Sequence, residues 1–237
     1  ATTEIYTLSP HAPLPIIRQP AGMAALLALA IAGPAVPFVG VPVMGHLYGT
    51  ISTLPIALCS IIMNLFQVPV TLLILSSGSP DRKGAGFMQH ILHTLKEPVV
   101  WAPLLALILL LLNLHIPEQI RSALQLLGGT TGGVALFASG IILYSYHVVI
   151  NRTVVLAVLA KNILLPLAIL ALALWLHTDR QTLHLSVVSM AIPTASVCVI
   201  LAVQYNTAEQ EIASILFFST LFSIITMGGL LYYLGGN

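Results

Sequence analysis

Two proline-containing breaks interrupt apolar runs of this 237-residue chain, the first between Gly33 and Pro42 and the second between Ala191 and Ser196. A proline inside a membrane helix removes a backbone donor and clashes with the preceding turn. The half-helix that restarts after a break presents free N–H groups and a partial positive charge, which suit a carboxylate. Paired breaks in two halves of a chain are typical of the binding site of a transporter.

The backbone around these two breaks is therefore the first candidate for a substrate site. Gly40 allows another backbone or a ligand to come close, and Thr194 and Ser196 add hydroxyl groups. The alternative is that the prolines only kink packed helices, but the pairing of the breaks favours a binding role. The predicted substrate-binding residues at the breaks are Pro34, Ala35, Pro37, Gly40, Pro193, Thr194 and Ser196.

Lys161 is the one clearly intramembrane charge that the sequence predicts. It lies roughly 12 Å from the start of its span at 1.5 Å per residue, and a charge at mid-membrane costs roughly 2.5–3.5 kcal/mol on insertion scales. Lys161 either balances an anionic substrate, holds Asn162 and a carbonyl of a broken helix, or extends to the cytoplasmic interface. We include it among the predicted substrate-binding residues.

Asn64 and Gln67 are three residues apart on the second span, so they share one face of the helix. An unpaired amide in hydrocarbon is costly, so this face is expected to point inward. Two roles remain open, which are contact with the substrate and hydrogen bonding between helices. Both residues complete the predicted substrate-binding set.

The composition indicates a polytopic membrane protein. The chain is 58% hydrophobic and 6% charged, with a mean hydropathy of +1.01, whereas a soluble domain has about 25% charged residues. The net charge of +1 gives no sign of nucleic-acid binding, and Cys59 and Cys198 are typical of small buried apolar residues. We expect no metal site and no cofactor. We also expect that the protein is not an enzyme, because the predicted spans contain no catalytic pair and no metal-binding helix motif.

Seven segments are long enough to enter a bilayer, where a span needs about 20 apolar residues. Residues 22–76 and 183–234 share one order, in which a broken helix is followed by a turn with a tyrosine and a long closing helix. If the halves are repeats of five spans, this odd number places the two repeats in opposite orientations, so we predict an all-α inverted-repeat fold with a broken helix in each repeat. The predicted spans are 22–46, 51–76, 98–114, 118–147, 153–176, 183–204 and 208–234.

Lysine and arginine placement predicts the orientation. Five of these residues fall on the side of the loop after the second span and two on the other, which puts that loop in the cytoplasm and the C-terminus outside. The predicted organisation is a polar N-terminal segment (1–20), the end of a first repeat (21–77), a cytoplasmic loop (78–97) and a second five-helix repeat (98–237).

Four motifs carry a resemblance to a known family: Glu97–Pro103, Gly133–Gly140, Lys161–Pro166, and Ile192–Thr194 with Ala202–Tyr205. With them the chain resembles the auxin efflux carrier family of membrane transporters, including bacterial carriers of malonate and other organic anions. The resemblance implies ten spans in two inverted repeats, with helices four and nine broken and crossing at mid-membrane, and this chain would lack the first three spans. It also implies scaffold-type helices at 98–147 and transport-type helices at 153–234. Ala35 and Pro37 stand where many members have asparagine and glycine.

The expected function is secondary active transport of small organic anions or carboxylates, such as malonate, by alternating access. The expected setting is the bacterial inner (plasma) membrane, with the lipid bilayer and the anion as partners. A proton as coupling ion and a homodimer are left open. The alternative is a non-transporting membrane sensor or an incomplete, inactive transporter fragment.

Overall fold

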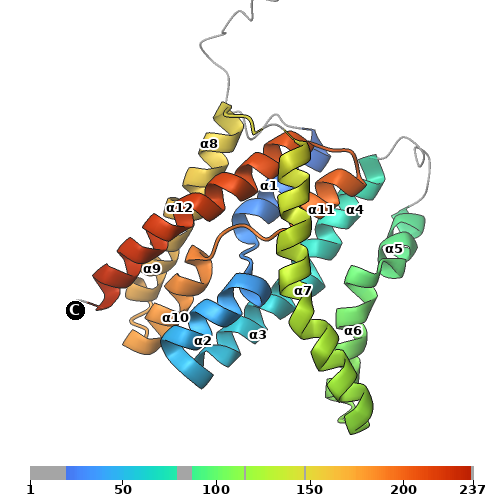
Figure 1. The fold of residues 1–237 in the computed structure, drawn as a ribbon, viewed down its shortest axis with the longest axis horizontal. Coiled ribbons are helices and arrows are strands. Elements are labelled where there is room, and N and C mark those ends of the chain that lie inside the picture. Colours follow the sequence, from blue (N-terminus) through green and yellow to red (C-terminus); the bar gives the residue numbers. More distant parts are fainter. Residues whose placement is uncertain (1–19, 79–86, 115, 147, 236–237) are drawn as a thin grey trace, which may run out of the picture.

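The computed structural model describes residues 20–78, 87–114, 116–146 and 148–235, and these form an all-α polytopic membrane protein (Figure 1). Most of the predicted segment 1–20, together with Arg82 and Lys83, falls outside the described residues. The helical stretches long and apolar enough to cross a bilayer are Val36–Ser77, Glu118–Ser145, Arg152–Trp175 and Glu209–Leu234, and the shorter apolar helices are Ala21–Ala32 and Pro98–Leu111.

The first unit begins with a helix that breaks midway. Helix α1 (Ala21–Ala32) ends before the break, and a π-helical turn, η1 (Val36–Gly40), starts the second half, α2 (Val41–Tyr48). Gly49 then reverses the chain with a φ of 59°, a conformation that suits glycine. The closing helix follows as η2 (Gly49–Ser52), α3 (Thr53–Ile62), the π-helical turn η3 (Met63–Gln67) and α4 (Val68–Gly78).

The second unit repeats this order in the opposite direction. Helix α10 (Arg180–Ala191) ends at the second break, α11 (Val197–Gln204) continues after it, and α12 (Glu209–Gly235) closes the unit. The two breaks meet in an antiparallel bridge between Pro34 and Thr194. The inverted arrangement with crossed broken helices, predicted from the sequence, is therefore present in the structure.

The helices between the two units flank the crossing. They are α5 (Phe87–Lys96), α6 (Pro98–Leu111), α7 (Glu118–Ser145) and a long helix formed by α8 (Arg152–Leu159), the π-helical turn η5 (Ala160–Leu164) and α9 (Leu165–Trp175). Residues 87–96, placed in a loop by the sequence, instead form a helix that packs on α4 and α6. Helix α7 contacts η1, α11 and α12, and Figure 1 shows it running past the crossing.

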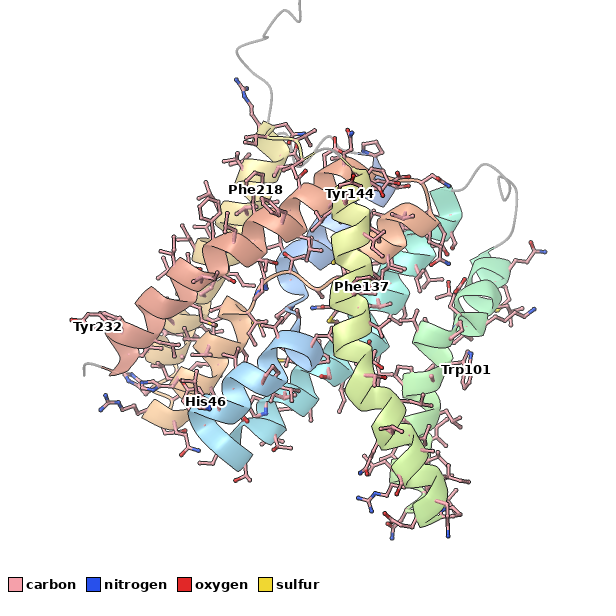
Figure 2. All side chains as sticks on the ribbon, viewed as in Figure 1. His46, Trp101, Phe137, Tyr144, Phe218 and Tyr232 are labelled. Carbon is pink, nitrogen blue, oxygen red and sulfur yellow. The ribbon has the colours of Figure 1, made fainter. Side chains whose placement is uncertain are left out.

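The core surrounds the two breaks. Every residue from 191 to 196 is buried, and so is every residue from 33 to 36. Apolar side chains also cover the outer surface, where Phe137, Trp101 and Tyr232 project away from the helices (Figure 2). Both the interior and the outer surface are apolar. The interior therefore differs from the surface in its close packing and in the hydrogen bonds between its buried polar groups.

Two glycines allow the chain to pack tightly at the first break. A Cβ atom on Gly33 would lie 2.6 Å from the Leu29 carbonyl oxygen, and one on Gly40 would lie 2.8 Å from Cδ1 of Ile192 in the second break. Both distances are shorter than a normal contact. These positions are therefore restricted by space, since neither glycine has a positive φ.

We predict that Gly33→Ala destabilises the protein by about 1–3 kcal/mol, because the new methyl group collides with a backbone oxygen that cannot move freely. The matched control is Gly45→Ala in α2, where a Cβ would meet nothing within 4 Å. That change should be neutral or stabilise by up to about 1 kcal/mol, as alanine favours helix. Thermal unfolding in detergent measures both, and equal midpoints for the two variants would contradict the prediction.

Candidate functional site at the helix crossing

Backbone hydrogen bonds join the two breaks directly. The N–H of Ala35 donates to the carbonyl of Pro193 at 2.8 Å, and the N–H of Ala195 donates to the carbonyl of Gly33 at 3.1 Å. Proline has no N–H of its own, so Pro193 can contribute only its carbonyl. Each break thus supplies a donor and an acceptor to the other, as a buried backbone at membrane depth requires.

Thr194 connects this bridge to α1 and α12, and Ser219 extends the connection to η5. Its hydroxyl donates to the carbonyl of Ala30 in α1 at 2.9 Å, and its N–H donates to Oγ of Ser219 in α12 at 3.2 Å. The Ser219 hydroxyl donates to Oδ1 of Asn162 at 2.8 Å, and the Asn162 amide returns a bond to the Ser219 carbonyl at 2.9 Å. All three side chains are buried. The bonds form a continuous polar network from η5 to the crossing.

The ends of the two first half-helices are held by side chains from π-helical turns. Nε2 of Gln67 in η3 donates to the carbonyl of Ala32, the last residue of α1, and Nζ of Lys161 in η5 donates to the carbonyl of Met190, next to the end of α10, both at 3.4 Å. Lys161 is only 1% exposed. A cation at a helix C-terminus is favourable, and π-helical turns are frequent at functional sites.

A cavity of about 290 Å³ opens beside the crossing. The two breaks, α7 and α12 form its wall, which is mainly apolar, with hydroxyl groups from Thr194, Ser196 and Thr220. At the start of α11 the N–H groups of Cys198 and Val199 donate to the carbonyls of Ala195 and Ser196, and this end of the helix carries a partial positive charge. The lining residues are Ala35, Phe38, Val39, Leu143, Pro193, Thr194, Ser196, Leu216, Phe217, Thr220, Leu221 and Ile224.

Four of the predicted substrate-binding residues line this cavity: Ala35, Pro193, Thr194 and Ser196. The others lie elsewhere around the crossing. Pro34 forms the bridge with Thr194, Gly40 packs against Ile192, and Pro37 lies in the first turn of η1, where proline fits well.

The remaining three polar residues bind protein carbonyls. Gln67 and Lys161 hold the helix ends described above. The Asn64 amide donates to the Ser60 carbonyl of its own helix at 2.9 Å. None of the three lines the cavity at the crossing.

Two residues of this region, Ser219 and Leu143, were not among the site residues predicted from the sequence. Ser219 was one of several hydroxyl residues on the last span, with nothing to single it out, and Leu143 of α7 had only its apolar character. The amide of Asn162 was the available signal, because a buried amide in a membrane needs a partner. The sequence does not show which of the serines supplies it.

The crossed broken helices have the architecture that is typical of inverted-repeat membrane transport proteins. A model of the family described as "Membrane transport protein" matches residues 85–231. The chain belongs to this family, the auxin efflux carrier family, as its motifs indicated.

Relatives of the chain include the "Uncharacterized transporter YfdV" of Escherichia coli strain K12 and its counterparts in E. coli O157:H7 and Shigella flexneri. Each is 33% identical over 207 residues, and the alignment covers 86% of this chain and 66% of the relative. The chain thus spans just under two thirds of the length of these proteins.

The polar network predicts an asymmetry between two serines on α12. Ser219→Ala removes the partner of the Thr194 N–H and of Asn162 Oδ1, so it should cost about 1–3 kcal/mol in stability. In the control Ser223→Ala, the lost hydroxyl only donates to the Thr220 carbonyl of its own helix, and the change should be much smaller. Thermal unfolding in detergent would measure both, and a Ser219 variant as stable as the Ser223 variant would argue against the network.

Proposed function

We propose that the protein carries small organic anions, with malonate as the model substrate, across the bacterial plasma membrane by alternating access. The substrate would bind in the cavity at the crossing. The orientation suggested by lysine and arginine placement has the C-terminus outside. Family membership supports transport, and the chemistry of the cavity supports the choice of an anion.

One observation carries this proposal. The cavity receives the N-terminal end of α11 together with the hydroxyl of Ser196, and its described lining includes no carboxylate. A helix N-terminus favours negative charge. Hydroxyl groups donate hydrogen bonds to carboxylate oxygens. A small dicarboxylate fits both properties, whereas a cation would meet the positive end of the helix dipole.

Lys161 strengthens the preference for anions without lining the cavity. Within the described residues, every acidic side chain lies at a helix end, on Glu97, Glu118, Asp179, Glu209 and Glu211. The ammonium group of Lys161 donates to a neutral carbonyl and not to one of these carboxylates. In a medium of low dielectric constant, such a charge acts over longer distances than it does in water. We propose that it attracts the anion through the crossing.

Alternating access requires that the crossing move relative to a fixed wall. Leu143 of α7 forms part of the cavity wall, while the opposite wall comes from the breaks and α12. The breaks, α12 and η5 are tied together by the hydrogen bonds of Thr194, Ser219 and Asn162. We propose that these tied elements move as one body past α7 and expose the cavity to each side in turn.

Uptake of labelled malonate into proteoliposomes tests the substrate site. Ser196→Ala should raise the KM for malonate roughly tenfold, which corresponds to loss of one hydrogen bond to a charged ligand. The control Ser145→Ala, at the exposed end of α7, should transport like the unchanged protein. Malonate uptake by the unchanged protein that equals uptake by empty liposomes would contradict the proposed substrate, and an unaltered KM in Ser196→Ala would contradict the site.

Two substitutions separate the charge of Lys161 from its hydrogen bond. Lys161→Gln retains a donor for the Met190 carbonyl but loses the charge, so malonate uptake should fall by roughly tenfold or more. Lys161→Arg retains the charge and should keep a larger share of the uptake. If Gln and Arg at this position support equal uptake, Lys161 acts through its hydrogen bond alone.

A further inference from the structure

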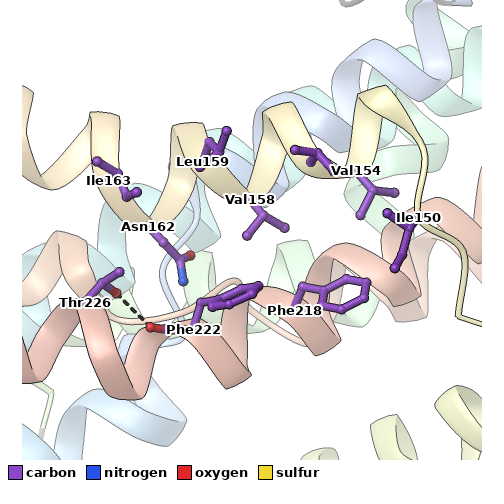
Figure 3. A pocket seen from close by; sticks show the side chains of 10 residues that line it. Ile150, Val154, Val158, Leu159, Asn162, Ile163, Phe218, Phe222 and Thr226 are labelled. Carbon is purple, nitrogen blue, oxygen red and sulfur yellow. Dashed lines mark hydrogen bonds between the residues drawn. The ribbon is translucent and has the colours of Figure 1, made fainter.

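Another hollow in the described part of the molecule lies away from the crossing. It is a groove of about 400 Å³ between the helix α8–η5 and α12. Figure 3 shows Val154, Val158 and Ile163 along one side, and Phe218 and Phe222, whose rings stack at 6.3 Å, along the other. Apart from Asn162 and Thr226, the lining is made of apolar side chains.

The two polar residues of this groove are already paired. Asn162 exchanges two hydrogen bonds with Ser219, and the hydroxyl of Thr226 donates to the Phe222 carbonyl at 3.1 Å (Figure 3). A polar ligand loses its hydrogen bonds to water when it binds, and few protein groups here are free to replace them. Its desolvation would therefore be costly. The lining suits a ligand that is apolar along its length.

The edge of the groove is exposed and apolar, as expected of a surface that faces the hydrocarbon of the bilayer. Val155 and Leu159 at its edge are 43% and 44% exposed, and Ile225 on the facing helix is 71% exposed. Both helices belong to stretches that are long and apolar enough to cross a membrane. What reaches this opening from the membrane is lipid.

The hollow is also long. A second hollow of about 240 Å³ shares Asn162, Ile163 and Thr226 with the groove and continues toward Leu167 and Leu230. Together they follow the two helices from Ile150, just before α8, to Leu167 in the first turn of α9. An extended and apolar space of this kind matches an alkyl chain better than a compact molecule.

We propose that this groove is a binding site for one acyl chain of a membrane phospholipid. The chain would lie between Val158 and Phe222 and fill the space over Asn162. Because Asn162 also belongs to the polar network of the crossing, the bound chain would hold η5 and α12 at the spacing that this network needs. The proposal concerns lipid binding and does not depend on what the crossing carries.

Native mass spectrometry of the purified protein, titrated with phosphatidylglycerol, tests the site. We expect retention of a lipid and about tenfold weaker binding in Val158→Phe, which removes space for roughly two methylene groups. Val155→Phe obstructs the edge of the groove at an exposed position and serves if Val158→Phe does not fold. The control Val70→Phe lies on the exposed face of α4 and should bind like the unchanged protein.

A second measurement locates the chain. In a background with Trp101→Phe and Trp175→Phe, the variant Phe222→Trp places the only tryptophan in the groove. Phospholipid with dibrominated acyl chains should quench it in a saturable manner, and Val155→Phe should weaken this quenching. Lipid retention that is equal in the groove variants and in Val70→Phe, or quenching that never saturates, would overturn the proposal.

Discussion

The structure depends on one constraint, which is that backbone groups exposed by a broken helix must be paired within the protein at membrane depth. An unsatisfied amide or carbonyl in hydrocarbon costs several kcal/mol. Here each break satisfies the other, through the bonds from Ala35 to Pro193 and from Ala195 to Gly33. Without the other break, each break would leave a backbone N–H and a carbonyl without a hydrogen-bond partner. The fold therefore needs both repeats.

The remaining polar groups of the interior are arranged around this pairing. The carbonyl ends of α1 and α10 receive donors from Gln67 and Lys161, which come from π-helical turns in neighbouring helices. Thr194 is bound to both α1 and α12. With its carbonyls covered by these donors, the crossing leaves the N-terminal end of α11 beside an accessible cavity, and that end attracts anions.

Much of the fold could be predicted from the sequence, because prolines in apolar spans and the order of the two units are local or repetitive signals. The helix at 87–96 was missed, since its histidines and its lysine resemble a polar connection. The site was only partly predictable. Pro193 and Thr194 indicate a helix break. How distant helices pack decides that Ser219 pairs with Asn162 and that Leu143 lies in the cavity wall. Single side chains carry no sign of that packing.

Substrate protection would test the central claim, that an anion binds beside the crossed breaks. A protein with Ser196→Cys, in a background where Cys59 and Cys198 are serine, would be reconstituted in liposomes and treated with a thiol reagent. Binding at the crossing predicts that malonate slows modification of the new cysteine in a saturable way, while the neutral diamide of malonate does not. Equal modification rates with and without malonate would contradict the claim.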